Sequence, residues 1–181
     1  MDTLPLHNMH LHHNGLTKAI AETYTEAARV CLDRHQNSPR EFGIEDDGSE
    51  NTVLVEWEQT DDRTRGAWAN ETDATCMGAY ACALAATEIQ RGLVAVHRAE
   101  THSGADYYIG PLGATKEDLE ECFRLEVSGS DQERSVIKTR LRIKVEQARN
   151  GNSNLPAIAA VVGFRTGLIL IETVTLNDVV D

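Results

Sequence analysis

Two acidic residues, Asp106 and Glu126, stand at equivalent points of residues 105–109 and 122–128, which we expect to form neighbouring strands. Carboxylates from adjacent strands can converge on one hard cation, and Mg²⁺ prefers oxygen ligands. Such an ion stabilises negative charge on a phosphate and lowers the pKa of an attacking water. The pair is therefore a candidate metal site. The alternative is structural, because strand carboxylates commonly face solvent or form salt bridges.

The elements that must position this pair follow from the apolar pattern. Glu126 lies between Leu125 and Val127, so we expect its side chain on the opposite face of the strand from theirs. Around the pair we expect a helix from Asn70 or Asp73 to Gly92, strands at 93–98, 105–109 and 122–128 (the last stopped by Gly129), a helix at 131–149, and strands at 156–164 and 168–173.

Residues 1–69 are expected to form an extension of the same single domain, which spans 1–181 with its core at 70–181. A helix capped by Asn14 should run to about His35. Strands at 41–45 and 52–58 should then form an acidic hairpin around the turn at 46–49.

The core resembles the PD-(D/E)xK nuclease superfamily, of which Holliday-junction resolvases are examples. The resemblance rests on the stretch RAETHSGADYYIG at 98–110, on RLEVSG at 124–129, and on the element order, and it covers about residues 70–173. It implies an α/β fold with a restriction-endonuclease-like αβββαβ core, preceded here by the N-terminal helix and β-hairpin. It also implies a Mg²⁺-dependent endonuclease that acts on DNA in repair, restriction or phage defence.

The same resemblance implies the ligand set. Asp106 and Glu126 would hold the ion, and the backbone carbonyl of Val127 would complete the protein ligands. An acid from the first helix of the core often joins, and Asp73 matches best by position, with Glu71 behind it. The alternative for Asp73 is a helix cap.

The chain departs from the family pattern at Ser128, where the E-x-K motif has its lysine. In some members the following helix supplies that lysine. Lys138 is our first candidate for this catalytic role and Lys144 the second. Alternatively, both belong to a solvated basic face or contact the phosphate backbone. If neither reaches the site, catalysis has been lost.

The charge distribution keeps other functions open. The formal net charge is −12, with eleven acids against two bases in residues 41–73, whereas residues 133–149 carry six bases against two acids. A net negative charge opposes nucleic-acid binding. The second hypothesis is therefore an inactive nuclease-fold subunit that binds a protein partner or forms a homodimer through the acidic hairpin. A third is an acidic inhibitor that occupies a nuclease's basic cleft.

The remaining features predict a soluble cytoplasmic protein with no membrane contact, because we find neither a signal peptide nor a long apolar run. We expect the four cysteines to be free thiols, and Trp57 and Trp68 to be packing residues. Four histidines near the N-terminus could bind a transition metal, but a flexible tail is the preferred interpretation; they are His7, His10, His12 and His13.

Overall fold

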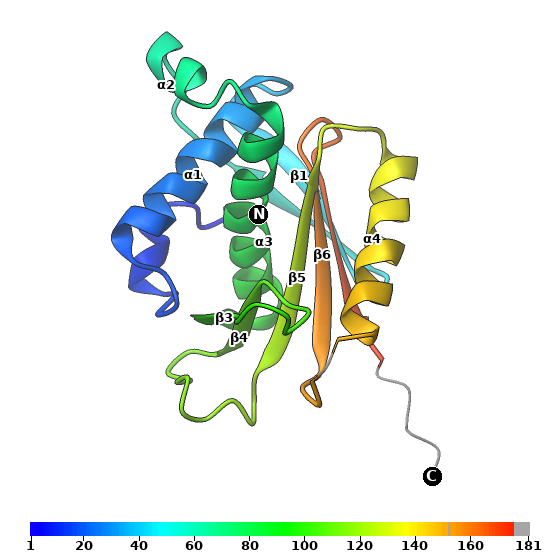
Figure 1. Cartoon of the computed structure of the whole chain (residues 1–181). Helices are drawn as coiled ribbons and strands as arrows, with labels where there is room; N and C mark the ends of the chain where they lie inside the picture. The colour runs from blue at the N-terminus through cyan, green and yellow to red at the C-terminus, as the bar shows by residue number, and fades with distance from the viewer. Residues whose placement is uncertain (152, 176–181) are drawn as a thin grey trace.

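A computed structural model describes residues 1–151 and 153–175. The described chain forms one mixed seven-stranded sheet with the strand order β2-β1-β7-β6-β5-β4-β3, and helices cover it (Figure 1). The α/β class is therefore confirmed. The strands are β1 Arg40–Asp46, β2 Ser49–Val55, β3 Leu93–Arg98, β4 Tyr107–Pro111, β5 Phe123–Ser130, β6 Ala157–Gly163 and β7 Leu168–Val174. The helices are the 3₁₀ turn η1 Met9–Leu11, α1 Lys18–Asp33, α2 Asp62–Ala67, α3 Glu71–Arg91 and α4 Arg134–Arg149.

Helices α3 and α4 lie on opposite faces of the sheet, and α1 packs outside α3 (Figure 1). The small residues of α3 allow this close packing. A Cβ on Gly78 would lie 2.9 Å from the backbone of Ala28 in α1, so the two helices touch nearly backbone to backbone. Leu125 and Val127 join the core beneath α3, while Glu126 faces α4, as the strand alternation predicted.

The acidic hairpin is an integral part of the sheet. Strand β1 pairs antiparallel with β2 and parallel with β7, so the hairpin extends the sheet beyond its last strand. On the other side, β3, β4 and β5 form an antiparallel meander, and β6 runs parallel to β5 after the α4 crossover. Such a crossover is what parallel neighbours require.

Local signals set most element ends. The Asn70 side chain accepts hydrogen bonds from the N–H groups of Thr72 and Asp73, and Gly92 ends α3 with a positive φ of 66°. Asn70 rather than Asp73 is thus the cap of α3. Gly129 was wrongly predicted to stop its strand: β5 continues to Ser130, and the glycine is needed because its Cβ would lie 2.5 Å from the carbonyl oxygen of Thr75.

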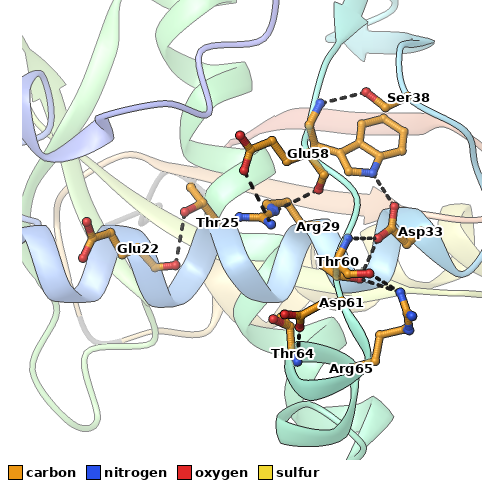
Figure 2. A network of polar contacts seen from close by, with 11 residues as sticks. Glu22, Thr25, Arg29, Asp33, Ser38, Glu58, Thr60, Asp61, Thr64 and Arg65 are labelled. Atoms are coloured by element: carbon orange, nitrogen blue, oxygen red, sulfur yellow. Dashed lines mark hydrogen bonds and ion pairs between the residues drawn. The ribbon is translucent and has the colours of Figure 1, made fainter.

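One other expectation was wrong, and one helix was missed. Helix α1 begins after Thr17, whose side chain accepts from Ile20 N–H, and not at Asn14. The short helix α2, capped by Asp61, was not predicted at all. Figure 2 shows how the chain around α2 is tied to α1: Asp33 accepts hydrogen bonds from the indole N–H of Trp57 and from Thr60. Trp57 is buried, as expected for a packing residue.

The N-terminal segment is built into the fold, so the prediction of a flexible tail was wrong. The Leu4 N–H donates to the Leu54 carbonyl on β2, and the Gly15 N–H donates to the Ala95 carbonyl on β3. These are the two edge strands of the sheet, and covering their free backbone groups protects them from pairing with another chain. His13 is fully buried and accepts the Ala95 N–H at 2.9 Å.

Candidate functional site

Asp106 and Glu126 lie where β4 and β5 part. The two strands pair from Ile109 to Tyr107 on β4, and the last backbone bond joins Asp106 N–H to the Leu125 carbonyl at 2.8 Å. Beyond that point β5 continues to Ser130 paired with β6 on its other side. The β5 edge that faces β4 is therefore open from Glu126 onward. We call the point where β4 and β5 separate, at Asp106 and Glu126, the fork.

The carboxylate of Asp106 is held by donors from two elements. Its Oδ2 accepts the backbone N–H of Val127 at 2.8 Å, so it replaces the missing strand partner of β5. Its Oδ1 accepts the hydroxyl of Tyr80 in α3 at 2.8 Å. Arg98, the last residue of β3, lies 3.8 Å from the same oxygen. Asp106 is therefore oriented from α3 and β5 together, with a positive charge nearby.

Glu126 is only 8% exposed and forms an ion pair with Lys144 of α4, whose Nζ donates to Oε2 at 2.8 Å. Burial raises the pKa of Glu126 above its usual value, and the negative charge of Asp106 raises it further. The hydrogen bond and the charge of Lys144 oppose this rise in pKa. The two carboxylates thus influence one another across the fork, although each has its own cationic neighbour.

The structure brings together some of the predicted site residues and separates others. Lys144, the second candidate, contacts Glu126. Lys138, the first candidate, lies 3.9 Å from Glu45 of β1, and Glu45 also pairs with Arg134. Asp73 is exposed in the first turn of α3.

A cavity of about 410 Å³ follows the open edge of β5 between α3 and α4. Arg140 and Lys144 line it from α4, and the backbone of β5 forms its floor. Ser128, which replaces the family lysine, also lines it, and its hydroxyl lies 3.5 Å from Arg140. The cavity is therefore reached by two cationic side chains and lies beside Glu126.

The donor atoms have the chemistry that a hard, hydrated cation prefers, but Asp106 is bonded to Tyr80 of α3 and Glu126 to Lys144 of α4, on the opposite face of the sheet (Figure 1). Two carboxylates and the carbonyl of Val127 are oxygen ligands, and Mg²⁺ uses few protein ligands because it keeps several waters. No group of three or more histidine, cysteine or acidic side chains is gathered for a metal within the described residues.

Sequence reasoning missed three residues of the site, Tyr80, Arg98 and Cys76. The spacing of Asp73, Cys76 and Tyr80 along α3 is three and then four residues, which places them on one helix face. That spacing could have identified the face turned toward the fork. Arg98 lay within the quoted motif, but only the fold shows that its side chain returns to Asp106.

No family model matches the sequence, and no curated protein or solved structure matches the chain. Within residues 1–151 and 153–175, no helix is both long enough and apolar enough to cross a membrane. Two of the N-terminal histidines, His12 and His13, each lie 3.0 Å from Glu88 of α3.

Proposed function

We propose that the protein is a Mg²⁺-dependent nuclease that acts on DNA, with Asp106 and Glu126 as metal ligands and Lys144 as the catalytic cation. The observation that carries the proposal is the 2.8 Å contact between Lys144 and Glu126 at the fork, because it supplies the positive charge that Ser128 cannot. Asp106 occupies the second ligand position, and the Val127 carbonyl the third.

The topology supports the proposal. From α3 to β6 the elements follow the order α-β-β-β-α-β that the PD-(D/E)xK resemblance implies. The three-stranded antiparallel meander, the crossover through α4 and the parallel fourth strand give a mixed sheet between two helices. Both acids lie at the end of the central pair of this core, where an open strand edge leaves room for a substrate.

The roles of the side chains follow from their contacts. When bound, the ion would supply charge neutralisation at the phosphate and a water of lowered pKa. Tyr80 and the Val127 N–H hold Asp106 in one orientation. The hydrogen bond and charge of Lys144 oppose the rise in the pKa of Glu126 that burial causes, and Lys144 lines the cavity, where its ammonium can meet a phosphate oxygen. Arg140 offers a second backbone contact.

A non-catalytic nuclease-fold subunit is the second candidate, and one observation favours it. Both oxygens of Asp106 already accept hydrogen bonds, and Glu126 already has a cation, so the acids are satisfied without a metal. For such a subunit the hairpin remains a candidate protein-binding surface. Asp46 is paired with Arg91, but Glu50 and Glu56 are exposed. Reversing their charge should then weaken a native complex.

One experiment separates these two functions. Purified protein is incubated with Mg²⁺ and with single-stranded, duplex and branched DNA, beside Glu126→Gln, which removes a ligand charge and keeps the side-chain shape. The nuclease proposal expects cleavage by the wild type, loss of cleavage with a chelator, and none by the variant. No cleavage of any substrate, together with a melting temperature that a chelator leaves unchanged, would favour the binding subunit.

A further inference from the structure

Past the fork, strand β5 has an open edge in the region flanked by α3 and α4 (Figure 1). The N–H and C=O of one strand residue point to the same edge, and those of the next residue point to the other edge. The Leu125 carbonyl and the Val127 N–H both point to the β4 side, because their partners are the backbone and the carboxylate of Asp106. Gly129, two residues further along, therefore directs its backbone groups to the same side.

Three backbone groups on this edge have no hydrogen-bond partner within residues 1–151 and 153–175, namely the Val127 carbonyl and the N–H and C=O of Gly129. The Asp106 carboxylate takes the place of a strand partner for the Val127 N–H alone. Both strand residues line the cavity of about 410 Å³, and Gly129 is half-buried. The unpaired edge of a strand is a template for another strand. The cavity therefore presents one donor and two acceptors in the geometry of a β-ladder.

The chemistry at the Gly129 end of the cavity, away from the fork, favours a peptide backbone. A peptide strand supplies both N–H donors and C=O acceptors, so it can pair with all three free groups. A phosphodiester supplies only acceptors and would leave the two carbonyls unpaired. The charged side chains lining this end are Glu71, Asp131 and Arg140, which give no positive excess for a polyanion.

Two charged side chains reach this end of the cavity from different helices. Glu71 belongs to the first turn of α3, and Arg140 belongs to α4, where its Nη1 donates to the Ser128 hydroxyl at 3.5 Å. Neither forms an ion pair within the described part of the chain, whereas Asp131 is paired with Arg34 at 3.0 Å. Successive side chains of a strand point to opposite faces. Adjacent basic and acidic residues of a bound peptide would thus face Glu71 and Arg140, respectively.

We propose that the β5 edge from Val127 to Gly129 binds an extended peptide segment of a partner protein by strand addition, and that Glu71 and Arg140 select adjacent basic and acidic residues in that segment. The peptide occupies the position beside β5 that β4 leaves at Asp106. Hydrogen bonds to the backbone give the affinity, and the two flanking charges give the preference for sequence. The inference goes beyond the proposed function and requires neither a metal nor cleavage of DNA.

Hydrogen exchange at the Gly129 amide, followed by NMR on the full chain, tests the proposal directly. The probe is the synthetic peptide acetyl-Thr-Val-Lys-Asp-Val-Thr-amide, and its Kd is taken from the shift of the Gly129 resonance. We expect exchange to slow about tenfold at a peptide concentration about ten times the Kd. The same peptide with methylated backbone nitrogens cannot pair as a strand and should give no protection. Unchanged exchange with millimolar probe, or equal protection by the methylated peptide, would overturn the proposal.

Two variants test the flanking charges. Arg140→Gln and Glu71→Gln should each raise the Kd of the probe about two- to fivefold, as expected for the loss of an exposed ion pair. Arg140→Lys should keep most of the affinity. The matched control is Arg142→Gln on the same helix, because Arg142 lines a different cavity beside the hairpin, and its Kd should equal that of the wild type. Equal Kd values in all four variants would contradict the proposed selection.

Peptide binding and DNA cleavage give separate readouts. Protection of Gly129 by the probe, without cleavage of any DNA, supports strand addition and removes the nuclease proposal. Cleavage by the wild type, with no protection of Gly129 by the probe, does the reverse. A single-stranded DNA oligonucleotide is titrated in the same exchange experiment. Protection of Gly129 by the oligonucleotide and not by the peptide would overturn the inference.

Discussion

The ammonium of Lys144 lies 2.8 Å from Glu126 Oε2, which joins α4 to the buried middle of β5. Lys138, six residues earlier on the same helix, lies beside Glu45 of β1, a strand separated from β5 by β7 and β6. Six residues correspond to a rotation of about 240° around a helix, so the two lysines cannot face the same strand. The rotation of α4 about its axis therefore determines that Lys144, and not Lys138, contacts Glu126.

If the protein is a nuclease, Lys144→Ala should lower the single-turnover cleavage rate by roughly 10²–10³, because a positioned electrostatic group is removed. Lys138→Ala is the matched control and should change the rate by no more than a few-fold. Both variants should bind DNA measurably. Equal losses in the two variants would assign both lysines to general phosphate attraction and not to the site.

Ser128→Lys should rescue Lys144→Ala. Positions 126 and 128 share one strand face, so a lysine at 128 points toward the same side as Glu126 and α4. We expect the double variant to regain much of the rate that Lys144→Ala loses, measured in the same cleavage assay. In the wild-type background the change should raise activity or leave it unaltered. A double variant no faster than Lys144→Ala would contradict the predicted rescue by a positive charge on this face of β5.

Gly78→Ala should destabilise the fold by about 1–3 kcal/mol, because its Cβ would lie 2.9 Å from the backbone of Ala28 and the two helices would have to move apart. Gly66→Ala, in the exposed helix α2, meets nothing within 4 Å and should be neutral or slightly stabilising. Urea denaturation measures both. Similar free energies of unfolding for the two variants would contradict the close α1–α3 contact.

The free energy of unfolding should decrease as the pH falls, because His13 takes up a proton more readily in the unfolded chain than in the folded protein. Burial lowers its pKa below the ordinary 6.5, although Glu88 opposes this, so the unfolded chain binds the proton more readily. The contribution is fully present above about pH 6.5 and is lost as the pH falls through the folded-state pKa. Protonation would also abolish acceptance of the Ala95 N–H.

The measurement is the free energy of unfolding between pH 7.5 and about pH 5.5. His13→Gln should show a smaller loss over this range than the wild type. It should also be less stable at pH 7.5 by about 1–3 kcal/mol if the buried Ala95 N–H loses its acceptor. His7→Gln, at an exposed position, should keep the wild-type pH dependence. An identical slope in His13→Gln would remove His13 as the cause.

The amino-acid sequence by itself determined the features that depend on near neighbours. Gly92 predicted the end of α3, Asn70 was one of its two predicted starts, and the run at Leu93–Arg98 predicted β3 with its observed bounds. The alternation around Glu126 predicted that this carboxylate faces away from its apolar neighbours. Caps, turns and strand alternation are decided within a few residues, so the chain carries these signals locally.

Only the tertiary structure decided which distant groups meet. The parallel pairing of β1 with β7, the N-terminal segment along both sheet edges and the choice of Lys144 over Lys138 all join residues far apart in the chain. Periodicity gives each helix and strand an apolar face but does not give its partner, its register or its rotation over the sheet. Those follow from packing of the whole core, because a shift of one strand residue or of a fraction of a helix turn would present different side chains to the fork.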